Sequence, residues 1–214
     1  MHDIAPNINL NNTMKKISGF TLIELLSVIA VAGVLASLAV PAISSFIQKN
    51  KLTVFGNELV SAMQVARSGA IQMGGPACVC ISATAGDVIP VCDGDDNWED
   101  GWIAFVDTNN AAINECVFEP ADGDILLKVW DGADMSNEIT LRSASATINA
   151  ADYVRFNQRG IPVTAQGANM QSTFKLCDSR GLLQSGNVVG KGVILSASGS
   201  LRTTKNAATI VSCL

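Results

Sequence analysis

An uninterrupted apolar run near the N-terminus constrains this chain more than any other feature. Phe20–Val40 holds 21 residues and a single charge, Glu24. As an α-helix it would span about 31 Å, which matches the hydrocarbon thickness of a bilayer. Lys15 and Lys16 precede the run, and no basic residue follows it until Lys49. This distribution predicts a membrane helix with a cytoplasmic N-terminus and a C-terminal bulk outside the cytoplasm.

Two ordinary explanations of such a run fit poorly. A secretory signal peptide has a short apolar core followed by a small-residue cleavage site, whereas here the small residue, Gly19, comes first. A plain signal anchor does not account for Glu24, because a carboxylate costs at least about 2.5 kcal/mol near the bilayer centre and somewhat less nearer its edge. A charge in that position needs a partner, so Glu24 is a candidate functional residue.

The residues around the start of this run carry a family resemblance. The stretch from Lys15 to Leu26, KKISGFTLIELL, resembles the class III signal of type IV prepilins and type II secretion pseudopilins. The resemblance implies cleavage by a prepilin peptidase between Gly19 and Phe20, with N-methylation of Phe20. It also implies that Glu24 neutralises the N-terminal amine of a neighbouring subunit. The family's leaders are usually short and basic, which points to Met14 as the true start.

A second helical segment is expected after the apolar run. Its apolar residues recur every three or four positions, as on one face of an α-helix: Leu52, Phe55, Leu59, Met63, Ala66, Ala70 and Met73. Gly74-Gly75-Pro76 should end it. Gly33 and Pro41 match the family's helix-loosening glycine and proline, and Pro41 should kink or locally melt the helix. The expected domains are a leader (1–19), a transmembrane half-helix (20–40), an amphipathic half-helix (41–75) and a periplasmic β-rich head (76–214).

The head contains short strand patterns separated by turn residues. The expected strands are Ala77–Ser82, Val88–Val91, Trp102–Val106, Ile125–Trp130, Ile139–Arg142, Tyr153–Phe156, Thr173–Cys177, Val193–Ser196, Ser200–Thr203 and Thr209–Cys213. The predicted fold class is therefore α+β, with a long helix covered by an antiparallel sheet. This is the type IV pilin fold that the resemblance implies.

The head also resembles the minor-pilin and pseudopilin family that groups the FimT and FimU pilins with GspH. The most specific motif is Trp98-x-x-Gly101-Trp102-x-x-Phe105-x-Asp107. The segment at the end of the helix, Ala66–Ile71, and the stretches Val154–Asn157 and Phe174–Asp178 add to it. The resemblance implies a minor, low-copy subunit.

Six cysteines all follow the apolar run, which favours disulfides in an oxidising compartment over metal binding. Six cysteines allow fifteen pairings, and sequence alone does not choose among them. We expect Cys177 to pair with Cys213, tying the last strand to the sheet. The preferred pairs for the others are Cys80–Cys92, across a hairpin, and Cys78–Cys116. Cys78 and Cys80 would share a strand face, so an exchange between them stays open.

Catalytic and metal chemistry find little support. The only histidine, His2, lies in the leader, so Ser-His and Cys-His catalysis are not expected in the mature protein. The run Asp93–Asn97 resembles the opening of a calcium loop, but Ala104 stands where the bidentate glutamate should be. Solvated turns explain this run and Asp107–Asn110 better. We expect no enzymatic activity, no cofactor and no metal.

DNA binding is the remaining alternative. Some FimT-like pilins bind DNA through a Gly-Arg-x-Arg motif, and Gly199-Ser200-Leu201-Arg202 resembles it with one arginine missing. Lys205 follows, and Arg180 and Lys191 could approach. The formal net charge of −5 argues against phosphate contacts. Weak or no DNA binding is expected.

The sequence therefore predicts a structural subunit that helps to initiate or cap a type IV pilus. A GspH-like pseudopilin of type II secretion and a DNA-binding subunit of DNA uptake are the alternatives. The expected partners are other minor and major pilins, through the N-terminal helix, and the prepilin peptidase. The expected location is the inner membrane with a periplasmic head, and later the filament.

Overall fold

A computed structural model describes residues 19–93, 97–108, 116–132, 138–143, 152–164, 166–211 and 213 of the 214-residue chain. The chain divides into two units, Met1–Ser45 and Phe46–Leu214. The leader residues 1–18, including Met14, Lys15 and Lys16, lie outside the described residues.

The first helix, α1 (Leu22–Met73), passes from the first unit into the second. It ends where predicted, at Gly74, whose φ of 63° lies in the left-handed region that glycine adopts without strain. The helix continues through Pro41 without local melting, and the kink that was the other expectation there stays a prediction. A proline removes one backbone donor, and a long helix can tolerate the loss of that single hydrogen bond.

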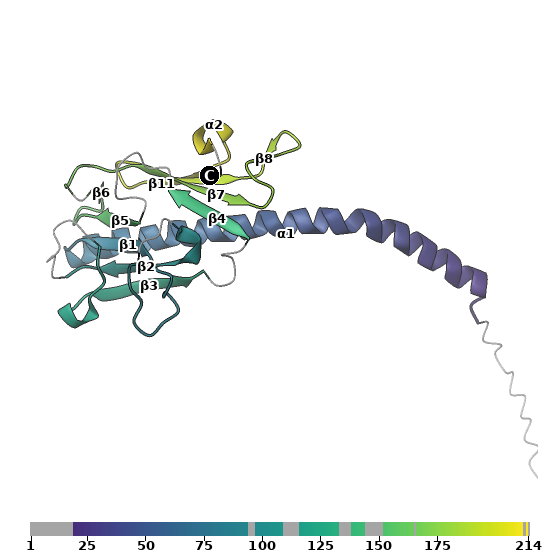
Figure 1. Cartoon of the computed structure of the whole chain (residues 1–214), viewed down its shortest axis with the longest axis horizontal. Helices are drawn as coiled ribbons and strands as arrows, with labels where there is room; N and C mark the ends of the chain where they lie inside the picture. Colours follow the sequence, from purple (N-terminus) through teal and green to yellow (C-terminus); the bar gives the residue numbers. More distant parts are fainter. Residues whose placement is uncertain are drawn as a thin grey trace, which may run out of the picture. The chain divides into compact units, whose positions relative to one another are not determined.

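The head begins with a five-stranded antiparallel sheet of order β3-β2-β1-β5-β6 (Figure 1). Its strands are β1 (Ala77–Ile81), β2 (Gly101–Val106), β3 (Ile125–Asp131), β5 (Tyr153–Phe156) and β6 (Pro162–Val163). Short 3-10 turns, η1 (Trp98–Asp100) and η2 (Pro120–Asp122), precede β2 and β3. The central strand β1 is buried along its whole length, which means that both faces of the sheet are covered at this strand, whereas the edge strand β3 is largely exposed.

A second antiparallel sheet has the order β11-β10-β7-β4. Its strands are β4 (Ile139–Ser143), β7 (Ser172–Asp178), β10 (Lys191–Leu195) and β11 (Leu201–Thr204). A small hairpin, β8 (Leu183–Gln184) with β9 (Asn187–Val188), stands between β7 and β10 in the chain. Antiparallel pairing throughout confirms the predicted α+β class.

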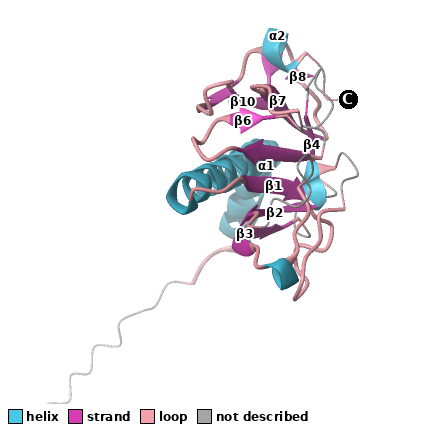
Figure 2. Ribbon diagram, turned by 90° about the vertical axis from the view of Figure 1, so that its left-hand side faces the viewer, coloured by secondary structure: helices cyan, strands magenta, loops and turns pink. Residues whose placement is uncertain are grey.

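The head half of α1 packs against both sheets, and glycines mark the closest approaches (Figure 2). A Cβ at Gly56 would lie 3.5 Å from Leu176 of β7, and one at Gly69 would lie 2.6 Å from Leu127 of β3. The predicted apolar stripe of the helix is buried from Leu52 to Ala70, whereas its last member, Met73, is exposed. This stripe is therefore the face on which the head folds.

Aromatic rings fill the space between α1 and the first sheet. Trp102 stacks on Trp130 at 4.1 Å between centroids, and Phe55 meets both rings edge-on. Such large buried rings contribute strongly to stability. The Trp-rich motif recognised in the sequence is thus part of the core.

Two expected strands are wrong. Val88–Val91 is an irregular loop in which Val88 is 99% exposed and only Pro90 is buried. Thr209–Cys213 is replaced by a short helix, α2 (Ala207–Ile210), whose N-cap Asn206 accepts a hydrogen bond from the Ala208 N–H at 2.9 Å. Asparagine is a strong N-cap residue, and here the cap outweighs the β-branched residues that follow it.

Candidate functional site

The first turn of α1 carries the expected processing and assembly residues. Thr21 precedes the helix, and its hydroxyl accepts a hydrogen bond from the Glu24 N–H at 3.3 Å. Thr21 and Glu24 thus have the spacing of a capping box. A carboxylate here also suits the positive end of the helix dipole. Phe20 is 84% exposed, and Glu24 lies one helical turn beyond it.

Beyond this turn, the first unit presents apolar side chains in every direction. An 18-residue window of α1 has a mean hydropathy of 2.4 and no buried residues, so this helix is long and apolar enough to cross a membrane. Gly33 lies within it, with nothing within 4 Å of a Cβ added there. A helix that is apolar all round requires an apolar environment such as lipid or other helices.

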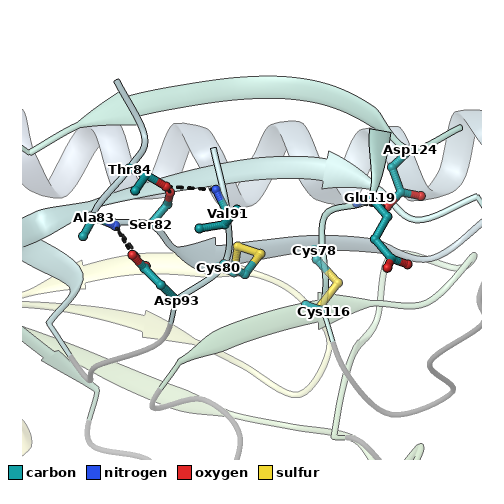
Figure 3. Close-up of a disulfide and its surroundings, with 11 residues drawn as sticks. Cys78, Cys80, Ser82, Ala83, Thr84, Val91, Asp93, Cys116, Glu119 and Asp124 are labelled. Carbon is teal, nitrogen blue, oxygen red and sulfur yellow. Dashed lines mark hydrogen bonds between the residues drawn. A yellow bond between two sulfur atoms is a disulfide. The ribbon is translucent and has the colours of Figure 1, made fainter. Parts of the chain in front are cut away.

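Two disulfides cover the outer face of the first sheet (Figure 3). Cys78 bonds to Cys116 and Cys80 to Cys92, with Cα–Cα distances of 5.9 and 5.6 Å. These are the preferred pairs of the sequence analysis, with both β1 cysteines on one strand face. Cys80–Cys92 closes a loop, and the hairpin expected there is absent. The disulfides lie in a small second core with Ile103 and Phe105.

A third disulfide joins the end of the chain to the second sheet. Cys177 of β7 bonds to Cys213, the pair expected from the sequence. The segment that it ties down is α2 and the residue after it, where the sequence analysis expected a last strand.

Arg67 of α1 holds two turns of the head together, a role that sequence reasoning missed. Its Nη1 donates to the Gly199 carbonyl at 2.9 Å and its Nη2 to the Ser198 carbonyl at 3.3 Å. Gly160 and Gly199 both have positive φ, and a Cβ at either would approach the Arg67 side chain within 3.1 Å. The one signal that pointed to this clamp was the family resemblance around Arg67.

Buried ion pairs fix other parts of the head. Glu99 of η1 is buried and accepts hydrogen bonds from the Leu141 N–H at 3.1 Å and from Arg142, which links the two sheets. Arg155 and Asp107 form a second buried pair at 3.8 Å. The sequence analysis noted Asp107 as part of a polar turn and missed its partner, because Asp107 follows β2 and Arg155 lies on β5, far along the chain.

Of the residues considered for DNA contact, Lys191 and Lys205 line one pocket, and Arg180 and Arg202 do not line it. Arg202 is exposed on β11, and Lys205 follows that strand. Arg180 is engaged by Asp178, and this contact raises the pKa of Arg180. Lys191 instead contacts Thr53 of α1. The structure therefore brings Lys191 and Lys205 together and leaves Arg180 in a separate ion pair.

The calcium-like run is only partly described. Asp93 accepts a hydrogen bond from the Ala83 N–H at 3.0 Å, as expected of a turn residue, while residues 94–96 lie outside the described chain (Figure 3). Across the described ranges, no group of three or more His, Cys, Asp or Glu side chains is arranged to hold a metal ion.

Two family models match this chain. Residues 14–40 match the prokaryotic N-terminal methylation motif. Residues 56–199, more than half of the chain, match type II transport protein GspH. The chain belongs to the GspH family. A long N-terminal helix followed by antiparallel sheets, together with the methylation motif, is the architecture of the minor pilins and pseudopilins of this family.

Solved structures of one protein are also similar to this GspH-family chain. The type IV minor pilin FimU of Pseudomonas aeruginosa PAO1 is 18% identical, with a TM-score of 0.49 over 74% of this chain and 92% of that one. A second crystal form of FimU gives 16% identity and a TM-score of 0.46 over 71% and 91%. No curated protein matches the chain.

Proposed function

We propose that this protein is a minor pilin that helps to initiate or cap the assembly of a type IV pilus. The observation that carries the proposal is the first half of α1, a fully exposed apolar helix whose one charge, Glu24, stands in its first turn. A folded head with its own core follows that helix. This combination suits a subunit that moves from a bilayer into a helix bundle, and it offers no catalytic constellation in the described residues.

The proposed cycle starts with processing. A prepilin peptidase cleaves between Gly19 and Phe20, and Phe20 is N-methylated. The helix then rests in the inner membrane with the head in the periplasm, an orientation supported by the lysines before the apolar run.

Assembly transfers the helix into the filament. There the Glu24 carboxylate meets the Phe20 amine of a neighbouring subunit inside an apolar bundle. An unpaired charge in such surroundings is costly, so the pair favours one axial register between subunits. Gly33 and Pro41 are proposed to let the helix adjust its curvature in the bundle.

A second candidate is a pseudopilin of type II secretion. It is favoured by the description of the matching family model, type II transport protein GspH. Both candidates use the same helix and the same charge pair. They differ in the filament that the subunit joins, a type IV pilus or the pseudopilus of type II secretion.

Deletion of the gene tests the proposal. Surface pili, secretion of exported proteins and transformation by DNA are scored together, with a plasmid copy as control. We expect loss or reduction of pili with normal secretion. A secretion defect with normal pili would favour the pseudopilin, and a defect in transformation alone would favour the DNA-uptake alternative. Intact-mass spectrometry should find an N-methylated Phe20, and a mature N-terminus after Val40 would refute the proposed processing.

A further inference from the structure

Three lysines from distant parts of the chain surround one small pocket of the head. Lys49 lies on α1, Lys191 begins β10 and Lys205 follows β11, and all three line a pocket of about 60 Å³. Val188 and Val189 form apolar walls beside them. No carboxylate is found among the described residues that line this pocket. Apolar walls strengthen the field of the ammonium groups, because little solvent screens them.

The absence of a carboxylate beside these three lysines, among the residues that the structure describes, contrasts with the surroundings of most other cations in the head. Most other cations of the described head contact carboxylates: Lys51 with Glu138, Lys128 with Glu58, Arg142 with Glu99, Arg155 with Asp107 and Arg180 with Asp178. Lys51 follows Lys49 by two residues, yet it joins Glu138 at a separate pocket. The three-lysine pocket is therefore a local positive site on a chain whose net charge is −5.

The fold holds the lysines of the pocket in place. The Lys191 ammonium donates to the Thr53 hydroxyl, which in turn donates to the Lys49 carbonyl at 2.8 Å. Lys205 stands between the last pair of the sheet, Thr204 with Gly192, and the capping residue Asn206 of α2. Burial and the neighbouring Lys205 lower the pKa of Lys191, as expected for like charges held together without an anion.

We propose that this three-lysine pocket binds the phosphodiester of an anionic phospholipid headgroup. The position along α1 favours this source of phosphate. The exposed apolar side chains of the helix continue past Val40 to Phe46 and Ile47, and Lys49 lies two residues beyond Ile47. Since this apolar surface extends beyond Val40, the pocket of a subunit held in the membrane by that helix would come near the headgroups, where basic residues bind anionic lipid. The inference rests on the membrane-stored state of the proposed function.

The pocket gives the stored subunit a defined height and rotation at the membrane surface. A helix that is apolar all round has no preferred orientation in lipid, since every face is equally soluble. A headgroup bound by Lys49, Lys191 and Lys205 would fix which side of the head faces the bilayer. Extraction into a filament would then release the lipid.

Native mass spectrometry of the full mature chain in detergent tests the pocket. The probes are phosphatidylglycerol, phosphatidylcholine, inorganic phosphate and a short DNA duplex. We expect one tightly held phosphatidylglycerol and weaker binding of phosphatidylcholine. Lys191→Met and Lys205→Gln should each weaken phosphatidylglycerol binding about fivefold. Arg202→Gln is the matched control, because it removes one charge from the neighbouring strand without touching the pocket, and it should leave binding unchanged.

Several results would overturn the proposal. Equal binding of the two lipids, or equal loss in Arg202→Gln and the pocket variants, would show that the pocket does not recognise the headgroup. Displacement of the lipid by phosphate or DNA at equal concentration would refute lipid as the source of the phosphate. The Lys191→Met variant should fold normally, because it replaces a half-buried charge by an apolar side chain of similar length. If that variant fails to fold, Lys205→Gln tests the same site. Incorporation into sheared pili is scored in parallel, so that failure of the lipid site and failure of the pilin function are distinguished.

Discussion

The two halves of α1 are parts of one continuous helix in opposite surroundings. Up to Ile47 its large apolar side chains are exposed, whereas from Leu52 to Ala70 an apolar stripe is fully buried against two sheets. The buried half has polar residues on its other faces, and the exposed half has apolar residues on all of them. Hydrophobicity alone therefore does not make a core, because only the half with a covering layer folds against its own chain. In the proposed function, the exposed half binds lipid before assembly and other subunits after it.

The largest expected difference is in the free energy of unfolding, when the same leucine-to-alanine substitution is made in each half of α1. Leu59→Ala removes a fully buried side chain and should lower the free energy of unfolding of the head by about 2–5 kcal/mol. Leu35→Ala removes the same side chain where it is 62% exposed and should change that free energy by less than about 0.5 kcal/mol. Urea unfolding in detergent, followed by fluorescence of the three head tryptophans, measures both. Equal effects would contradict the contrast between the halves.

Removal of a disulfide should cause the next largest loss of stability of the head. Replacing Cys177 and Cys213 together by serine frees a segment with a sequence separation of 36 and should cost about 2–4 kcal/mol. Non-reducing peptide mapping of the exported wild type should recover the three pairs of the structure. Recovery of Cys78–Cys92 with Cys80–Cys116 would show that the exchange left open by the sequence has occurred.

The sequence predicted the parts of this molecule that depend on local pattern. Both helix segments and eight of the strand positions follow from periodicity, turn residues and the family resemblance. The preferred cysteine pairs match the structure, although the hairpin and the last strand on which they rested are absent. Val88–Val91 failed because a β-branched run says nothing about whether a neighbouring strand exists to pair with it. Thr209–Cys213 failed because the capping power of Asn206 was not weighed against those residues.

The contacts between distant segments could not be predicted in the same way. The clamp of Arg67 on Gly199 joins residues 132 positions apart, and the meeting of Lys49, Lys191 and Lys205 depends on how α1 lies against the second sheet. Sequence patterns report the environment of a residue and do not report its partner. Glu24 was identified because an isolated charge in an apolar run is itself a local signal.

A smaller loss of stability is expected when the hydrogen bonds of Arg67 to the β10–β11 turn are removed. Arg67→Ala should destabilise the head by about 1–3 kcal/mol, because two carbonyls of the β10–β11 turn lose a charged donor. Arg67→Lys should recover only part of this loss, since an ammonium cannot reach both carbonyls with the geometry of a planar guanidinium. Arg159→Ala, on an exposed arginine, is the matched control for loss of charge. Thermal unfolding of the three variants measures these effects. An unchanged midpoint for Arg67→Ala would show that the hydrogen bonds of Arg67 do not stabilise the head.

Incorporation of a Glu24→Gln subunit into sheared filaments tests the central proposal most directly. Glutamine preserves the capping-box pattern with Thr21 and removes only the charge. We predict normal membrane insertion and an N-methylated Phe20, but at least about tenfold less of the variant in filaments, because the neighbour's amine then lacks its partner in an apolar bundle. Ser27→Ala, which alters a neighbouring residue whose hydroxyl donates to the Glu24 carbonyl, should be incorporated normally. Equal amounts of Glu24→Gln and wild-type protein in the filaments would contradict the proposed assembly.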